Sequence, residues 1–263
     1  MNIIADLHTH TIKSITGTST LKELTGAASQ EKLKCIAVTD YGPKTNMSKK
    51  DLFKYISYLP EKLNNIQVIK GIEADVMELH SGKLDISDAE SDEFDWITGA
   101  YHEISEYDKQ ILNNTILTNL YLNMANNPIL NTISHMEREE CGFDTEKVLS
   151  VMKQNGKVVE ISAAHFDRKP DYIKKRLISL IKVCKEDNIP ICIVSNAHSY
   201  SDIGKFEDIK KYFESISFPE ELIINSDKEL LFDYIKKFKE LKKKKLEEQQ
   251  INTLRKRGGA RPF

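Results

Sequence analysis

The chain lacks the features that mark secreted, membrane-spanning and nucleic-acid-binding proteins. Its 263 residues include only four cysteines, and none of them forms a CxxC pair. No stretch approaches the roughly 18 consecutive apolar residues of a membrane span, and no basic segment followed by a long apolar run opens the chain. The formal net charge is only −2, so no overall attraction to nucleic acid is implied. We expect a soluble, cytoplasmic protein with reduced, mostly buried thiols and no nucleic-acid or membrane partner.

Segments typical of strands and of helices alternate along the chain. Apolar runs typical of buried strands lie at Ile3–Asp6, Cys35–Thr39, Ile66–Ile72, Trp96–Ala100, Ile129–Ser134, Val158–Ile161 and Ile191–Ser195. Helical periodicity occurs at Thr20–Lys32, with Thr18 or Ser19 as the N-cap, and at Lys49–Leu59, Asp108–Met124, Thr145–Asn155, Pro170–Glu186 and Phe206–Ser215. This alternation predicts an α/β fold with helices outside a parallel sheet. Seven strands over this length favour a closed (β/α) barrel, and an open sheet is the alternative.

The end of the chain differs in composition from the rest. Asp227–Gln249 has helical periodicity and many charges, including the run Lys242–Lys245, which is typical of a solvated last helix. Gln250–Phe263 is basic and contains glycine, and we expect it to be a flexible tail. The predicted organisation is therefore one large domain at residues 1–236, followed by a charged helix end and basic tail at residues 237–263.

Histidine is scarce, with seven copies, yet most copies directly follow a predicted strand. The residues in such positions are His8, His10, His102, His135 and His198, together with Glu73 at the end of the third strand. In a barrel the carboxyl ends of the strands converge on one face, where catalytic groups are assembled. A mixed set of imidazole and carboxylate ligands suits zinc, manganese or iron, and a glutamate such as Glu73 can bridge two ions. The sequence therefore predicts a metal site at the mouth of a barrel.

Six short motifs at these strand ends resemble those of a known family. The motifs DLHTHT, TDYGP, GIEAD, YHE, ISH and SNAH are similar, in this order, to the series found in the polymerase and histidinol phosphatase (PHP) domain family, and the strongest likeness is to its small stand-alone bacterial phosphatases. The resemblance covers residues 2–236. It implies a distorted (β/α)7 barrel of the TIM type, up to three divalent metal ions, and hydrolysis of phosphate esters.

The resemblance also implies roles for particular residues. His8 and His10 match one metal site, and His102 and His135 match a second site that shares Glu73. His198 matches the last histidine of the family pattern, where it would bind a metal. Three positions depart from the pattern: Thr16 and Tyr41 stand where the family usually has histidine, and Asn196 stands where it usually has aspartate. We therefore expect two divalent ions (Zn²⁺, Mn²⁺ or Fe²⁺), Asn196 as a weaker neutral ligand, and a weak or empty third site.

Further residues are candidates for contact with a small phosphorylated substrate. We expect Glu73, His198 and Tyr41 to take part in catalysis, since a phenol can hydrogen-bond a phosphate oxygen. Arg168, with Lys169 beside it, is a candidate phosphate clamp because a guanidinium forks onto phosphate. His165 could contact substrate or donate a proton; an ordinary loop charge and a buried structural histidine are the alternatives for Arg168 and His165.

The sequence leads us to expect a metal-dependent phosphoesterase, with three alternatives. A degenerate PHP barrel that binds metal or ligand for regulation would explain the three altered positions. An amidohydrolase can also begin with an HxH motif, but Asn196 gives no metal carboxylate near the last strand. A proofreading nuclease would be expected to show a basic stripe, and the sequence has basic clusters only toward its end. The oligomeric state is not predicted.

Overall fold

Seven parallel strands build the centre of the computed structural model, which describes residues 1–49, 51–102, 106–166 and 170–258. They are β1 (Ala5–Thr9), β2 (Cys35–Val38), β4 (Ile66–Glu78), β6 (Trp96–Ala100) and β7 (Thr132–Ile133), adjacent in this order, and the pair β8 (Val159–Ser162) and β9 (Ile191–Val194). Each falls on a strand predicted from the sequence. Two short antiparallel strands, β3 (Lys62–Leu63) and β5 (Lys83–Leu84), also pair with β4.

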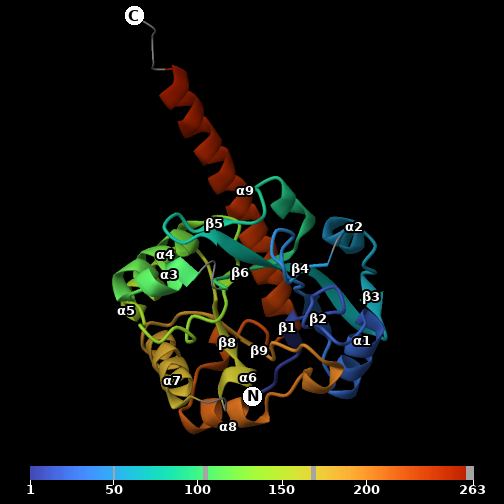
Figure 1. The fold of residues 1–263 in the computed structure, drawn as a ribbon. Helices are drawn as coiled ribbons and strands as arrows, with labels where there is room; N and C mark the ends of the chain where they lie inside the picture. Colours follow the sequence, from blue (N-terminus) through green and yellow to red (C-terminus); the bar gives the residue numbers. More distant parts are fainter. Residues whose placement is uncertain (50, 103–105, 167–169, 259–263) are drawn as a thin grey trace, which may run out of the picture.

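Backbone hydrogen bonds join the two sheets into a barrel (Figure 1). On one side, the N–H of Val158 donates to the carbonyl of Asn131 at 3.1 Å, beside β8 and β7. On the other side, the N–H of His10 donates to the carbonyl of Ala197 at 2.8 Å, and the N–H of Ala197 donates to the carbonyl of His8 at 3.3 Å. The expected distorted (β/α)7 barrel is therefore confirmed, and the open sheet is not the fold.

A buried asparagine links the last strand to the first. The side-chain amide of Asn225 donates to the carbonyls of Ala5 in β1 and Ile193 in β9, at 2.8 and 2.7 Å. Its side-chain oxygen accepts the N–H of Ile193 at 3.1 Å. Asn225 is fully buried. Its side-chain amide satisfies backbone groups of the two strands that would otherwise be buried without a hydrogen-bond partner.

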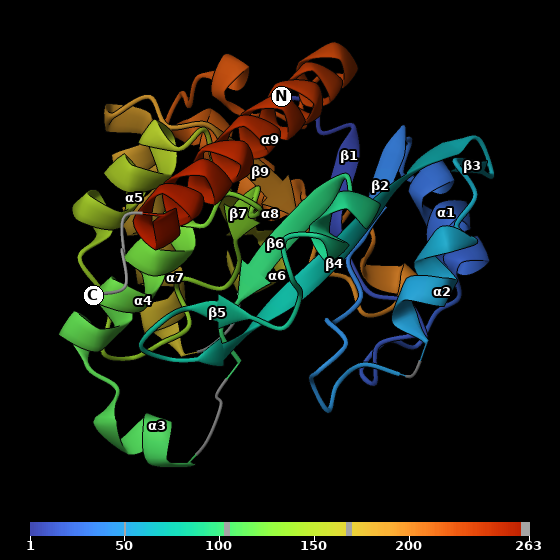
Figure 2. The ribbon, with the colours of Figure 1, turned by 90° about the horizontal axis from the view of Figure 1, so that it is seen from above.

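Helices surround this barrel (Figure 2). They are α1 (Leu21–Gln30), α2 (Leu52–Ser57), α3 (Glu106–Ile111), α4 (Asn114–Asn126), α5 (Thr145–Gln154), α6 (Ala163–Phe166), α7 (Asp171–Glu186) and α8 (Glu207–Ser215), with short 3-10 turns η1 (Glu90–Glu93), η2 (Tyr200–Asp202) and η3 (Glu220–Leu222). Most of these helices lie within the ranges predicted from helical periodicity in the sequence. The large core cluster joins helix residues such as Leu24 and Leu177 to strand residues such as Ile36 and Ile161.

Several predicted helix boundaries are wrong for identifiable reasons. The N-cap of α1 is Thr20, neither Thr18 nor Ser19, because Thr20 and Glu23 form a capping box. The single helix predicted at Asp108–Met124 is two helices, because the Asn113 side chain accepts the N–H of Ile116 and starts α4 afresh. Helix α2 is shorter than predicted.

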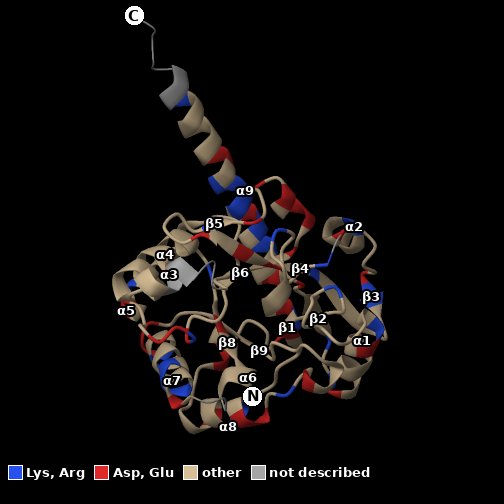
Figure 3. Ribbon diagram, in the orientation of Figure 1, with Lys and Arg blue, Asp and Glu red and all other residues tan. Residues whose placement is uncertain are grey.

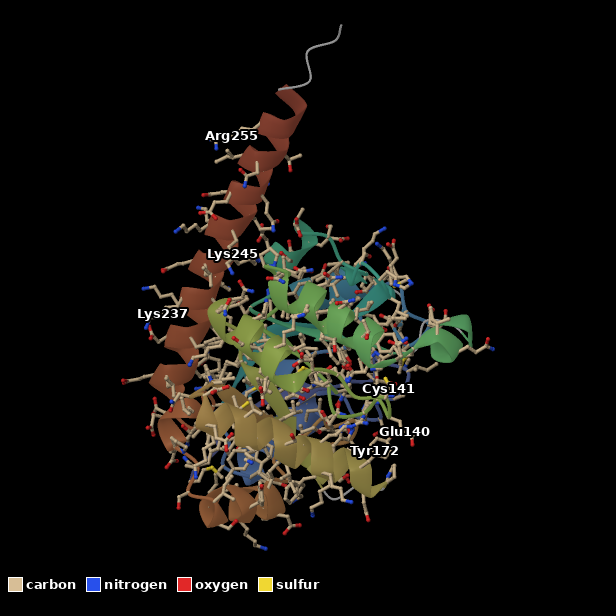
Figure 4. All side chains as sticks on the ribbon, turned by 90° about the vertical axis from the view of Figure 1, so that its left-hand side faces the viewer. Glu140, Cys141, Tyr172, Lys237, Lys245 and Arg255 are labelled. Carbon is tan, nitrogen blue, oxygen red and sulfur yellow. The ribbon has the colours of Figure 1, made fainter. Side chains whose placement is uncertain are left out.

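The last helix, α9 (Lys228–Gly258), has a packed beginning and a projecting end. Leu231 and Ile235 pack against residues at the starts of the strands, including Ala5, Cys35 and Trp96. This packing covers the barrel end opposite the carboxyl ends of the strands. Figures 1 and 4 show the later turns, from about Lys245 to Arg255, leaving the body of the molecule.

The flexible tail predicted from Gln250 onward is wrong up to Gly258, where the chain is helical. The physical reason is that no proline and no glycine interrupts residues 228–257, which are rich in good helix formers such as lysine, leucine and glutamate. Figure 3 shows several lysines and arginines along this helix. Among the described residues, none of the helices combines the length and the apolar character needed to cross a membrane.

The thiols are distributed as the sequence led us to expect. Cys35, Cys184 and Cys192 are buried and Cys141 is exposed, and all four are free. Burial raises the pKa of the Cys35 thiol to about 11, so this group stays a neutral apolar filler of the core.

Candidate metal centre

Glu73 lies at the centre of a cluster of four histidines and divides them into two pairs. Its Oε2 lies 3.5 Å from Nε2 of His8 and 3.4 Å from Nε2 of His10. Its Oε1 lies 3.3 Å from Nε2 of His135 and 3.8 Å from Nε2 of His102. The carboxylate is almost fully buried within β4. The structure thus brings together the residues that the sequence predicted for two adjoining metal sites.

The distances around Oε2 of Glu73 fit a bound ion. Nε2 of His8 and Nε2 of His10 are 3.2 Å apart, so the three possible ligand atoms form a nearly equilateral triangle. A tetrahedral ion with ligand distances of about 2.1 Å separates its ligands by about 3.4 Å. The Oε2 atom makes no hydrogen bond with any described residue although it is buried, which is costly unless a cation satisfies it.

The second pair of histidines is held by unusual backbone geometry and a hydroxyl. His135 has φ 58°, a left-handed conformation that is uncommon outside glycine and that clusters at functional sites. Ser134 donates a hydrogen bond to Oε1 of Glu73 at 3.0 Å. With His102 at the carboxyl end of β6, this side of Glu73 presents a donor set suited to a second ion.

Three of the four histidines have their other ring nitrogen held by a second side chain. Nδ1 of His8 lies 2.9 Å from Oε1 of Glu160, and Nδ1 of His102 lies 3.2 Å from Oδ2 of Asp75. Nδ1 of His10 lies 3.1 Å from the hydroxyl of Ser14. Such partners fix the tautomer, so that Nε2 is free to bind metal.

Sequence reasoning missed these partners. Asp75 could have been found, because it stands two residues after Glu73 on the same strand and therefore on the same face. Glu160 gave no such signal, because β8 approaches β1 only in the closed barrel.

The charges in the cluster are strongly coupled. Burial alone would raise the pKa of Glu73, but the nearby His8 and His102 lower it well below its usual range. Burial would lower the pKa of His8, yet the carboxylates of Glu160 and Glu73 raise it well above its usual value. Burial dominates at His135 and lowers its pKa to about 3. Glu73 therefore stays ionised and His135 stays neutral, as metal ligands must be.

Asn196 lies just past β9, beside the end of β1. Its neighbour Ala197 pairs with Thr9, which brings this loop against the strand that carries His8. Asn196 has φ 55°, and its buried Oδ1 has no hydrogen-bond partner among the described residues. An unpaired amide oxygen in this position fits the neutral ligand that the sequence led us to expect.

The three positions of the family's third site also lie together. The Thr16 hydroxyl is 2.9 Å from Nδ1 of His198, and it donates to the Tyr41 hydroxyl at 3.4 Å. The ring of His198 stacks on that of His10, with centroids 4.4 Å apart. Burial raises the pKa of Tyr41 to about 12, so its phenol stays a neutral hydrogen-bond donor. Two hydroxyls thus stand at the positions where the resemblance implies imidazoles.

Of the remaining predicted residues, the structure describes His165 but not Arg168 or Lys169. His165, in α6, is buried, and its Nδ1 lies 2.5 Å from Oε1 of Glu137. Arg168 and Lys169 lie outside the described residues. Arg138, which the sequence reasoning did not single out, places its positive charge near Tyr41 and His102, where it acts to lower the pKa of both.

A pocket of about 390 Å³ adjoins the cluster. Asn196 and His198 line it, together with Ser195, Ala163, Lys205 and several acidic side chains that follow β9. Its volume is in the range of pockets that hold small molecules.

Comparison with known proteins identifies the family. The PHP domain matches residues 6–191, which is most of the chain, and the chain therefore belongs to the PHP domain family. A probable phosphatase of Acetivibrio thermocellus is 29% identical over 91% of this chain and 98% of its own length. A probable phosphatase of Thermoanaerobacter sp. (strain X514) is 30% identical over 91% of this chain and 97% of its own length.

A solved structure shares the fold. Histidinol phosphate phosphatase from Lactococcus lactis, crystallised with zinc, L-histidinol and phosphate, superposes with a TM-score of 0.56. The match covers 79% of this chain and 92% of that chain at 16% sequence identity. The likeness confirms the distorted barrel expected from the motif series.

Proposed function

We propose that the protein is a metal-dependent phosphatase that hydrolyses the phosphoester of a small molecule. The observation that carries this proposal is the arrangement around Glu73, whose two oxygens each face a separate pair of imidazole nitrogens. Such a donor set would suit the two ions of a hydrolytic centre. The names of the relatives and the phosphate and zinc in the Lactococcus lactis structure support the same reaction and the same kind of metal.

The chain's own residues would hold two ions and leave the third position weak. His8, His10 and Glu73, with Asn196 as a neutral ligand, would hold the first ion. Glu73, His102 and His135 would hold the second. Two divalent ions bound there would supply Lewis-acid stabilisation of the phosphate oxygens and would lower the pKa of an attacking water.

The residues around this centre would bind and orient the phosphate. The neutral phenol of Tyr41 would donate a hydrogen bond to a phosphate oxygen, and Thr16 and His198 would hold that phenol in place. Arg138 supplies positive charge on the same side, and we still predict that Arg168 and His165 contact the substrate. The rest of a small substrate would occupy the pocket beside Asn196 and His198.

An assay with matched variants tests the proposal. Purified protein is stripped of metal, reloaded with Zn²⁺ or Mn²⁺, and tested on p-nitrophenyl phosphate and a panel of small phosphomonoesters. We expect slow hydrolysis that rises with added metal, because the site with the neutral Asn196 binds its ion weakly and fills only at higher metal concentrations. Glu73→Gln should lower the rate at least ~100-fold, whereas His80→Gln, which changes an exposed histidine outside the cluster, should not change it.

One outcome would replace the enzyme by a binding module. If the metal-saturated wild type hydrolyses nothing on the panel and behaves like Glu73→Gln, the altered third site has removed catalysis. The protein would then be a PHP barrel that binds metal or ligand without turnover.

A further inference from the structure

A second group of possible metal ligands shares His135 with the Glu73 centre and adds Glu137 and His165. His135, Glu137 and His165 each offer a ligand atom, and these atoms all lie within 4.8 Å of one another. All three residues are buried, with exposed fractions of 6%, 1% and 5%. Glu137 and His165 come from different parts of the barrel, the loop after β7 and helix α6. The three residues meet only because β7 and β8 are neighbours.

The group contains an unsatisfied ring nitrogen. Nδ1 of His135 is buried and has no hydrogen-bond partner among the described residues, whereas its Nε2 faces Glu73. A histidine that binds metal through one nitrogen normally donates its other N–H to a partner. A metal ion bound to Nδ1 would satisfy this nitrogen.

The donor chemistry of the group fits a transition-metal ion. Two imidazoles and one carboxylate form a set that zinc, manganese and iron accept. Nδ1 of His165 and Oε1 of Glu137 are 2.5 Å apart, a distance typical of a shared proton. A tetrahedral ion with ligand distances of about 2.1 Å separates its ligands by about 3.4 Å, so these two atoms would have to move apart by roughly 0.9 Å.

We propose that His135, Glu137 and His165 form a metal-binding site of their own, next to the Glu73 centre. A neutral imidazole has only one lone pair, so His135 binds either an ion of the Glu73 centre through Nε2 or an ion of the new site through Nδ1, but not both at once. The new site is therefore an alternative position for the second ion. At this position the chain could hold an ion without Glu73 as a ligand.

The test measures metal binding after the Glu73 centre has been weakened. Glu73→Gln keeps the shape of the side chain and removes the charge shared by the two family sites. Equilibrium dialysis with Co²⁺ and Zn²⁺, followed by metal analysis, gives the number and affinity of bound ions. Glu73→Gln is compared with double variants that add Glu137→Gln or His165→Gln, and with a control that adds His80→Gln.

The new site predicts a clear difference among these proteins. Glu73→Gln and its His80→Gln control should retain one ion with equal affinity, and adding Glu137→Gln or His165→Gln should weaken that ion at least ten-fold. Equal affinities in all four proteins would overturn the proposal. Circular dichroism of the metal-free proteins checks folding, and His165→Asn replaces His165→Gln in the double variant if that protein does not fold.

The result separates this inference from the proposed phosphatase function. Metal binding that depends on His165 in a protein without phosphatase activity would support the new site and reject the enzyme. Phosphatase activity that depends on Glu73, with no metal binding that depends on His165, would support the enzyme and reject the new site.

Discussion

Nδ1 of His8 lies 2.9 Å from Oε1 of Glu160, although 152 residues separate the two in the chain. Both side chains are buried, and Coulombic attraction to Glu160 and Glu73 raises the pKa of His8 in spite of the burial. The carboxylate therefore sets the orientation of His8 and directs Nε2 toward Glu73. This contact joins β8 to β1 across the inside of the barrel.

Replacing Glu160 with glutamine should weaken the first metal site. The amide keeps the shape of the side chain but loses the charge that orients His8 and raises its basicity, and changes of this kind typically cost 10–100-fold in metal affinity. We expect that loss in a zinc titration, with activity recovering at high metal. Glu140→Gln, at an exposed position, is the control, and an affinity equal to that of wild type would show that Glu160 does not support the site.

Asn196→Asp should strengthen the same site. The Asn196 side-chain oxygen is buried without a partner, and an aspartate there would add the anionic charge that the family pattern contains. Aspartate tolerates the left-handed backbone of this position. We expect more metal per purified chain and a higher rate at low metal. Asn188→Asp is the matched control, because Asn188 is exposed and has φ 51°. Unchanged metal content and rate would remove Asn196 from the ligand set.

Changing Thr16 and Tyr41 together to histidine should rebuild the third site. The two hydroxyls already contact each other, and Thr16 contacts His198, so the new imidazoles would start close to the remaining one. We expect one further ion per chain by metal analysis and faster turnover. A stoichiometry that does not rise would show that the backbone of this loop no longer fits an ion.

Asp85 should make stability fall as pH rises through weakly acidic values. Burial raises its pKa to about 6 although the N–H groups of Asp75 and Lys44 donate to it. The folded chain therefore holds a proton that the unfolded chain releases near pH 4. The stabilisation is complete below the unfolded pKa and is lost as pH rises to about 6, with a slope of at most about 1.4 kcal/mol per pH unit. Urea unfolding of wild type and Asp85→Asn between pH 4 and 7 measures this slope, which should be flatter in the variant.

Thr20→Ala should destabilise the protein through the start of α1. The Thr20 hydroxyl accepts the N–H of Glu23, and the Glu23 carboxylate accepts the N–H of Thr20. Loss of such a cap typically costs about 1 kcal/mol, measured as the free energy of unfolding in urea. Thr20→Ser retains the hydroxyl and should be close to wild type. If the alanine variant is equally stable, the capping box contributes nothing measurable.

The local pattern of the sequence was sufficient to predict most strands and helices and the types of residue offered as metal ligands. Apolar runs bounded by polar loops predicted the seven strands, because a strand buried on both faces needs continuous apolar residues. The placement of His8, His10, Glu73, His102 and His135 after or within these strands predicted that they would meet. The predicted helix boundaries were wrong where a single side chain sets the start of a helix, as Asn113 does for α4.

Only the tertiary structure decided which groups support the ligands and how the barrel closes. Glu160, Asp75 and Glu137 hold histidines that are up to 152 residues away, and Asn225 joins β1 to β9. Such pairs depend on which strands become neighbours and on backbone conformations such as φ 58° at His135. Those features arise from packing over the whole chain, whereas periodicity reports only on neighbours in sequence. The sequence by itself therefore determined the chemistry available to the site, and the closed barrel determined its geometry.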